Sequence, residues 1–302
     1  MLIIIVTFAV YSSLGSPGET IKVSGAWALY PIMVKWAEEY QKIYPEVRID
    51  VSAGGAGKGM ADALGGLVNI GMVSREVFSE EIEQGAFWVS VCKDAVVPTV
   101  NENNPLLEEL LTKGVKRHTF MGIWINENIT TWGEVVGTEV TDEIHVYTRS
   151  DACGAAKTWA KYLGYKQEDL LGVAVYGDPG LAEAVKGDPL GIGYNNINYA
   201  YDMETKEPVE GIVVIPIDLN ENGKVDEDED YINKDEIVEA IATGAYPSPP
   251  ARDLNLVTKD KFTGITKEFV KWILIEGQQY VPETGYAQLP EEGLSEELAK
   301  LD

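Results

Sequence analysis

Three short segments place small residues where a predicted strand leads into a predicted helix. They are Ser24-Gly25-Ala26, Ser52 to Gly57, and Arg149 to Ala155. The first N–H groups of a helix have no acceptor inside the helix, and this end of the helix carries a partial positive charge. Each segment is therefore a candidate site for an anion that is bound by backbone N–H groups.

Two arginines accompany these turns. Arg75 follows Ser74 at the end of a predicted strand, and Arg149 opens the third turn. A guanidinium group offers forked N–H donors that match the oxygens of a tetrahedral oxyanion. Ligands of open α/β sheets bind at the carboxyl ends of strands, so the four segments together predict one anion site. A single glycine-rich turn would be only a tight turn, and the prediction depends on the combination.

The elements that must position these turns alternate between strand and helix. A helix after the first turn is predicted by apolar residues at helical spacing, from Leu29 to Ile43, with Pro31 in its first turn. The alternation begins again near residue 144, and it predicts an α/β fold with mixed, mostly parallel sheets and helices on both faces. The predicted strands are Ile21–Ser24, Val47–Val51, Asn69–Val73, Ile144–Thr148 and Gly191–Tyr194.

Later segments carry boundary signals. Asn233, with Glu236 three residues on, predicts a capping box at a helix start. Thr266 is predicted to cap the last long helix. Ala95–Val100 is predicted to cross between two domains, with Pro98 tolerated only at a sheet edge.

The composition fits a folded protein of about two domains, given 302 residues with 45% hydrophobic and 24% charged residues. The chain has 24 Lys and Arg against 49 Asp and Glu, a net charge of -25, which argues against nucleic-acid binding. Leu2–Val10 is too short to span a bilayer, but it has the length of a signal-peptide core. Residues 1–16 are therefore predicted to be a signal-like segment of an exported protein.

Enzymatic interpretations have weaker support. Gly57-Lys58 lacks the rest of a phosphate-binding P-loop, and no group of His, Cys and Asp has zinc spacing. Cys153 and His145 are separated by eight residues, so a cysteine nucleophile with a histidine base is an alternative. A histidine on a strand near a turn cysteine is the simpler interpretation of that pair.

Residues 218–229 follow the twelve-residue pattern of an EF-hand calcium loop. Gly223 falls at the sharp turn and Val225 at the apolar anchor position. The segment before the loop is predicted to be a strand, so the loop lacks the usual first helix, and an acidic surface hairpin is the alternative. We predict a structural Ca²⁺ ion, with candidate ligands Asp218, Asn220, Asn222, Lys224 (through its carbonyl), Asp226 and Glu229.

Several sequence blocks, taken in order between Val23 and Leu289, resemble one known family. They include VSGAWALYPIMVKWAEEYQKIYP, VSAGGAGKGMADALGGLVNIGMVSRE, TRSDACGAAKTWAKYLG and GAYPSPPARDLNLVTK. The chain is similar to the phosphate-binding proteins of phosphate ABC transporters, which have the type II periplasmic binding fold. Cys153 and Ala155 depart from the family pattern, which has Ser and Thr there. The calcium loop is not part of that pattern.

The resemblance implies two lobes that close on one oxyanion. We expect residues 20–96 with 252–302 in one lobe, and residues 97–251, which include the calcium loop, in the other. Asp151 is expected to accept a proton of hydrogen phosphate. The implied anion-binding residues are Ala26, Trp27, Ala28, Ser52, Gly54, Gly55, Ser74, Arg75, Arg149, Asp151, Cys153, Gly154 and Ala155.

The resulting hypothesis is an exported, monomeric solute-binding protein, periplasmic or on the outer cell surface, that delivers inorganic phosphate to an ABC permease. Three alternatives remain open. The bound anion is another oxyanion, such as sulfate, molybdate or tungstate; the chain is an exported hydrolase that uses Cys153 with His145; or it is a calcium-stabilised adhesion or signalling protein.

Overall fold

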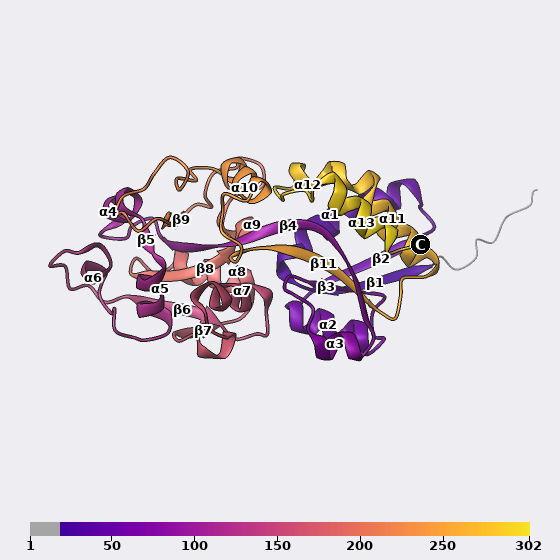
Figure 1. Ribbon diagram of the computed structural model, residues 1–302, viewed down its shortest axis with the longest axis horizontal. Helices are drawn as coiled ribbons and strands as arrows, with labels where there is room; N and C mark the ends of the chain where they lie inside the picture. Colours follow the sequence, from indigo (N-terminus) through magenta and orange to yellow (C-terminus); the bar gives the residue numbers. More distant parts are fainter. Residues whose placement is uncertain (1–18) are drawn as a thin grey trace, which may run out of the picture.

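The computed structural model describes residues 19–302, and the predicted signal-like segment lies outside this range. Two lobes lie side by side, and the long strands β4 (Ala86–Asn101) and β11 (Ala251–Lys259) run from one into the other (Figure 1). Among the described residues, no helix is long and apolar enough to cross a membrane.

The first lobe starts with the predicted alternation of strands and helices. All four residues of its strand β3 are buried, and the strand lies against helix α2 and the strands beside it. Helix α1 buries one stripe, which includes Trp36 and Tyr40, and Pro31 lies in its first turn. The elements are β1 (Thr20–Gly25), α1 (Tyr30–Ile43), β2 (Arg48–Ala53), α2 (Ala56–Leu64), β3 (Ile70–Val73), α3 (Ser79–Glu83), α11 (Gly264–Leu274), α12 (Tyr280–Glu283) and α13 (Glu291–Ala299).

The second lobe lies between the two crossing strands in the sequence. Asn233 caps its last helix as predicted, because the Asn233 side chain accepts hydrogen bonds from the N–H groups of Asp235 and Glu236. The elements are α4 (Leu107–Lys113), β5 (Val115–Lys116), α5 (Arg117–Trp124), α6 (Trp132–Val136), β6 (His145–Arg149), α7 (Gly154–Leu163), β7 (Val173–Val175), α8 (Gly177–Lys186), β8 (Gly191–Asn196), α9 (Ile197–Ala200), β9 (Ile212–Val214), β10 (Ile217–Asp218) and α10 (Lys234–Thr243).

The main sheet runs through both lobes in the order β2-β1-β3-β11-β4-β8-β6-β7, with β9 beside β4. The pairs β1–β2, β1–β3, β6–β7 and β6–β8 are parallel, whereas the crossing strands β4 and β11 pair antiparallel to their neighbours. The predicted mixed, mostly parallel α/β architecture is therefore confirmed.

Two hydrophobic cores underlie the two lobes. One draws on residues 21–92 and 254–301, and the other on residues 95–251 with Ala287. The chain passes from one core to the other between Cys92 and Ala95, and returns between Ala251 and Leu254. Both cysteines are buried and neither forms a disulfide.

Two sequence expectations need correction. Pro98 is not on an edge strand; it lies in the interior of β4, opposite Tyr194 of β8. On its other side, β4 pairs with β11 up to Ala95 and with β9 from Thr99. Pro98 lies between these two paired stretches, so the N–H that proline lacks is not needed for either. Thr266 lies inside α11, and Thr263 is the residue that precedes the helix.

Candidate anion-binding site

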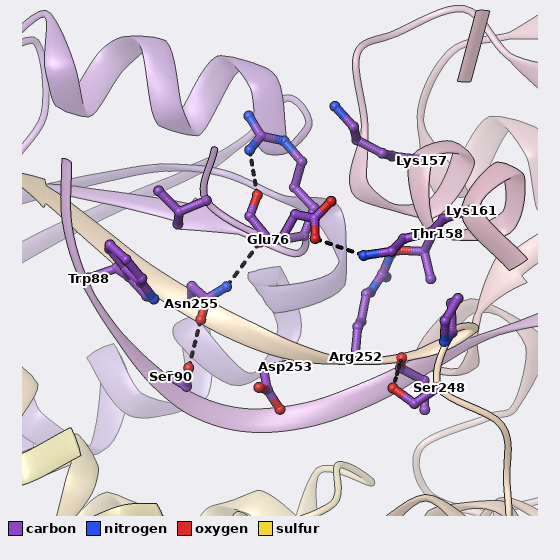
Figure 2. A pocket seen from close by; sticks show the side chains of 14 residues that line it. Glu76, Trp88, Ser90, Lys157, Thr158, Lys161, Ser248, Arg252, Asp253 and Asn255 are labelled. Carbon is purple, nitrogen blue, oxygen red and sulfur yellow. Dashed lines mark hydrogen bonds and ion pairs between the residues drawn. The ribbon is translucent and has the colours of Figure 1, made fainter. Parts of the chain in front are cut away.

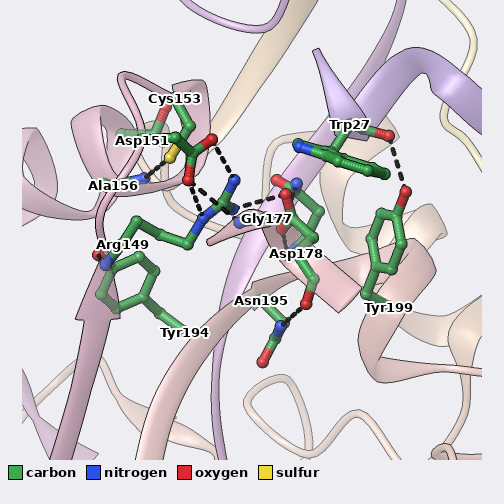
Figure 3. Close-up of polar contacts among 12 residues, drawn as sticks. Trp27, Arg149, Asp151, Cys153, Ala156, Gly177, Asp178, Tyr194, Asn195 and Tyr199 are labelled. Atoms are coloured by element: carbon green, nitrogen blue, oxygen red, sulfur yellow. Dashed lines mark hydrogen bonds and ion pairs between the residues drawn. The ribbon is translucent and has the colours of Figure 1, made fainter. Parts of the chain in front are cut away.

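Arg149 is the centre of the candidate site, at the end of β6. Its Nε and Nη2 atoms donate to the two carboxylate oxygens of Asp151, at 2.8 and 2.7 Å. Its Nη1 atom donates to Oδ2 of Asp178, at 2.6 Å (Figure 3). Burial opposes the charged form of Arg149, but the carboxylates of Asp178 and Asp151 outweigh it and raise the arginine pKa above its ordinary value. The guanidinium therefore stays charged inside the protein.

Asp178 is held in turn by the neighbouring strand. It is only 1% exposed, in the first turn of α8, and its Oδ1 atom accepts from Nδ2 of Asn196 at 2.6 Å. The hydroxyl of Tyr194, on β8, accepts from the backbone N–H of Arg149 at 3.2 Å. These contacts fix the arginine in one orientation, as a preorganised binding group requires.

The N-terminus of α7 lies next to Arg149. Gly154 and Ala155 are its first two residues, so their N–H groups have no acceptor within the helix. Cys153 precedes them, and its Sγ atom accepts from the N–H of Ala156 at 3.4 Å. This helix end offers N–H donors beside a guanidinium, which suits an oxyanion.

The first lobe closes directly against this region. The N–H of Gly57 donates to the carbonyl of Ala152 at 3.0 Å, across the lobes. A Cβ atom on Gly154 would overlap Ser74, so glycine is needed where these two segments touch. The glycine turn, Ser74 and the Arg149 turn are thus brought together as the sequence predicts.

Trp27 extends from the first lobe towards the second. Its ring packs on Gly177, where a Cβ atom would lie 3.3 Å from Cε2 of the indole, and Tyr199 donates to its carbonyl at 3.1 Å. The indole nitrogen is buried and has no hydrogen-bond acceptor among the described residues. Figure 3 shows this nitrogen on the side that faces Arg149 and Asp178. An anion between the lobes would supply the missing acceptor.

The other predicted site residues have different surroundings. The N–H groups of Gly54 and Gly55 donate to the carbonyl of Gly25, at 2.8 and 3.0 Å, so they are not available to a ligand here. The Ser52 hydroxyl donates to the carbonyl of Val23 at 3.3 Å. Ala26 and Ala28 are buried beside Trp27. Arg75 is not brought to Arg149; its guanidinium pairs with Glu81 at 2.6 Å.

The cysteine–histidine pair of the hydrolase alternative is not assembled. His145 is paired with Asp188, at 2.7 Å between Nδ1 and Oδ2, and no hydrogen bond joins it to Cys153 among the described residues. Burial raises the pKa of the Cys153 thiol to about 12, so the nucleophilic thiolate is scarce at neutral pH.

Residues 218–229 form a curled loop. The two carboxylate oxygens of Asp218 accept from the N–H groups of Asn222 and Gly223, at 3.0 and 2.8 Å. Gly223 has a φ of 81°, which glycine adopts without strain at the sharp turn. Oε1 of Glu229 accepts from the N–H of Leu219 at 2.7 Å. Across the described residues, no three His, Cys, Asp or Glu side chains are already gathered as a metal site.

Sequence reasoning missed Asp178 and Asn196. The available signal for Asp178 was its place in Gly177-Asp178-Pro179, an acidic residue at a helix start that directly follows a strand. Nothing local marks Asn196, because its role depends on β8 lying beside α8 in the folded chain.

A family model described as a PBP superfamily domain matches residues 12–276. The chain therefore belongs to this superfamily, and the match spans both lobes. The similarity extends to particular members whose ligand is known.

The phosphate-binding protein PstS of Methanocaldococcus jannaschii is 27% identical, over 90% of this chain and 83% of that protein. The PstS of Bacillus subtilis is 24% identical, over 88% of this chain and 81% of that protein. A putative phosphate ABC transporter substrate-binding protein from Clostridium perfringens, solved with bound phosphate, superposes with a TM-score of 0.74 at 23% identity, over 90% of this chain and 100% of that one. The structural likeness shows that the two chains share a fold.

Proposed function

We propose that the chain is a solute-binding protein that captures inorganic phosphate between its two lobes. The observation that carries this proposal is the buried Arg149, fixed between Asp151 and Asp178 beside the N–H donors of α7. Two PstS proteins among its relatives and the phosphate-bound Clostridium structure support phosphate as the ligand.

The mixture of donors and acceptors favours phosphate over sulfate. Arg149, the N–H groups of Gly154 and Ala155, and the Trp27 indole are donors for unprotonated oxygens. The Asp151 side chain beside them offers oxygens that accept hydrogen bonds. Phosphate retains at least one O–H at neutral pH, whereas sulfate has none and would place its oxygens against an unmatched carboxylate.

Release of the ligand requires the lobes to part. The cross-lobe contacts near the site include hydrogen bonds, such as Gly57 N–H to Ala152 and Tyr199 to Trp27, and the packing of the Trp27 ring on Gly177. Hinge bending of β4 and β11 would break them without disturbing either core. We propose that the ligand-loaded, closed form docks on an ABC permease outside the cytoplasm, after export directed by the signal-like segment.

We also propose that residues 218–229 bind a structural Ca²⁺ ion. Support comes from the match to the twelve-residue pattern and from the loop's curled backbone, with Asp218 and Glu229 almost fully buried. A bound cation would be held by oxygens that here accept the loop's internal hydrogen bonds, and it would link β10 to the segment that precedes α10.

Calorimetric titration of the protein, stripped of anions by unfolding and refolding, tests the main proposal. Phosphate should bind one-to-one and tightly, and sulfate, molybdate and tungstate should bind at least about 100-fold more weakly. Tight binding of another of these anions instead would identify a different cargo. No binding of any of them would reject the oxyanion function and favour the adhesion alternative.

A further inference from the structure

A cavity lies between the lobes, and Arg149 is not among the residues that line it. It has a volume of about 380 Å³, and its walls come from the loop after β3, from α7, and from β4 and β11 (Figure 2). The cavity, here called the hinge pocket, is lined by Arg75, whose neighbour Ser74 packs tightly on Gly154 of the Arg149 turn. The volume suits a small organic molecule rather than a lone inorganic anion.

Three of the four cationic side chains in the hinge pocket have carboxylate partners. Arg75 pairs with Glu81 at 2.6 Å, and Lys161 with Glu76 at 2.7 Å. The third of them, Arg252, pairs with Asp94 at 2.9 Å. Each of these three positive charges is therefore balanced by a neighbouring carboxylate.

Lys157 is the exception. Its Nζ atom lies 3.7 Å from the centre of the Phe78 ring, and the Arg75 guanidinium lies 4.4 Å from the same centre. Among the described residues Lys157 forms no ion pair, and Figure 2 shows its amine without a bonded partner. The two cations thus lie over one aromatic ring, and Glu81 pairs with Arg75 rather than with Lys157. Burial and the Arg75 charge lower the pKa of Lys157, although the carboxylates of Glu81, Glu168 and Glu76 oppose the shift.

We propose that the hinge pocket binds a small organic anion, with its charged group beside Lys157, at the end of the pocket that also holds Arg75. The body of the ligand would lie along β4, where the ring of Trp88 and the hydroxyl of Ser90 line the cavity. A carboxylate and a phosphate monoester offer the same chemistry to these cations, so both classes are tested below.

An occupant of the hinge pocket would favour closed lobes. Lys157 and Lys161 belong to α7 of the second lobe, whereas Phe78 and Glu76 belong to the first, so the cavity is complete only when the lobes meet. Arg252 also contacts the side chain of Asn196, which donates to Asp178. The pocket and the Arg149 site are therefore joined through one asparagine and one aspartate.

Ligands that both prefer the closed form strengthen each other's binding by the same factor. This part of the inference rests on the proposed phosphate function, whereas binding in the hinge pocket does not. We expect malate or glycerol 3-phosphate to increase phosphate affinity by about threefold or more, and phosphate to do the same for the organic anion.

The test is calorimetric titration of malate and of glycerol 3-phosphate into the full chain, with and without saturating phosphate. One-to-one binding that persists under saturating phosphate is expected for at least one of them. Lys157→Gln should abolish it, while phosphate affinity measured alone stays within about twofold of wild type. Lys166→Gln, at an exposed lysine just after α7, is the matched control and should change neither.

Displacement of malate or glycerol 3-phosphate by phosphate would place them at Arg149 and overturn the proposal. So would the absence of binding by both, or binding that Lys157→Gln leaves intact. If the wild-type protein binds malate but no phosphate, the phosphate function is refuted, whereas the proposed binding in the hinge pocket is still supported. Circular dichroism of Lys157→Gln establishes that the variant is folded.

Discussion

The Nη1 atom of Arg149 lies 2.6 Å from Oδ2 of Asp178, and neither side chain is more than 2% exposed. A buried pair of this kind is stable only with further hydrogen bonds to its remaining polar atoms. Asn196 supplies one to Asp178, and Asp151 takes two N–H groups of Arg149. The remaining guanidinium N–H groups have no partner among the described residues, which leaves them for a ligand.

The first prediction concerns this arginine. Arg149→Lys keeps the positive charge but loses the planar fork, so phosphate affinity should fall by about 100-fold. Calorimetric titration measures the loss, with Arg48→Lys at an exposed position as control. Unchanged affinity in Arg149→Lys would show that the anion site lies elsewhere.

Trp27→Phe removes an N–H group and keeps most of the aromatic packing on Gly177. Because the indole nitrogen is buried without an acceptor, we expect it to donate to the anion. Phosphate affinity should therefore fall by about 10-fold or more, as for a hydrogen bond to a charged group. The wild type should also show a tryptophan fluorescence change on binding that Trp27→Phe reduces. Trp88→Phe is the control, and equal losses in both variants would argue against a direct contact.

The Cys153 thiol should behave as a structural group. Its raised pKa and burial predict slow alkylation by iodoacetamide at neutral pH, with rapid reaction only after unfolding. Cys153→Ser keeps an acceptor for the Ala156 N–H and should retain phosphate affinity within about threefold. Hydrolysis of a phosphate ester that is lost on alkylation would instead restore the hydrolase alternative.

Calcium removal tests the loop at residues 218–229. In a buffer whose calcium concentration is well above the dissociation constant of the loop, chelation by EDTA should lower the melting temperature by about 3–5 °C. Asp218→Asn keeps an acceptor for the Gly223 N–H but removes the charge, and it should abolish the EDTA effect. Glu227→Gln, at an exposed loop position outside the predicted ligand set, should keep it. Identical melting curves with and without EDTA in the wild type would identify an acidic surface loop.

The sequence was informative wherever one local feature determines the structure. Glycine and small residues marked the strand-to-helix turns, because only they allow the close approach seen between Gly154 and Ser74. Asn233 and Glu236 predicted the start of α10 because they form a capping box, which is a contact within four residues. The alternation of strands and helices predicted the α/β class for the same reason.

Long-range contacts were not predictable in the same way. Arg75 follows a strand end just as Arg149 does, but the nearby Glu81 captures its guanidinium. Asp178 reaches Arg149 only because β7, which precedes α8, pairs with β6. Trp27 was expected to contribute to the anion site through the turn that contains it. The packing of its indole on Gly177 depends instead on the second lobe. These outcomes depend on tertiary packing, which a single sequence does not encode in a local pattern.

The last prediction concerns Lys234, at the start of α10, which is fully buried and contacts the side chain of Asn198. Gly285 of the first lobe packs directly on this lysine, where a Cβ atom would overlap Nζ and Cε. Burial, reinforced by the Lys206 charge, lowers the Lys234 pKa to about 7, although Asp202 and Asp235 oppose the shift.

Below about pH 7 Lys234 is charged in both the folded and the unfolded protein, and its burial destabilises the fold in full. Between about pH 7 and its ordinary value near 10.5, the unfolded chain binds more protons, so the free energy of unfolding should rise with pH. Lys234→Met keeps the packing without the charge. It should increase the free energy of unfolding by about 2 kcal/mol near neutral pH and flatten the rise. Urea unfolding at about pH 6.5 and about pH 9 measures both effects, with the exposed Lys166→Met as control. A variant less stable than wild type at both pH values would show that the lysine forms a stabilising contact across the lobes.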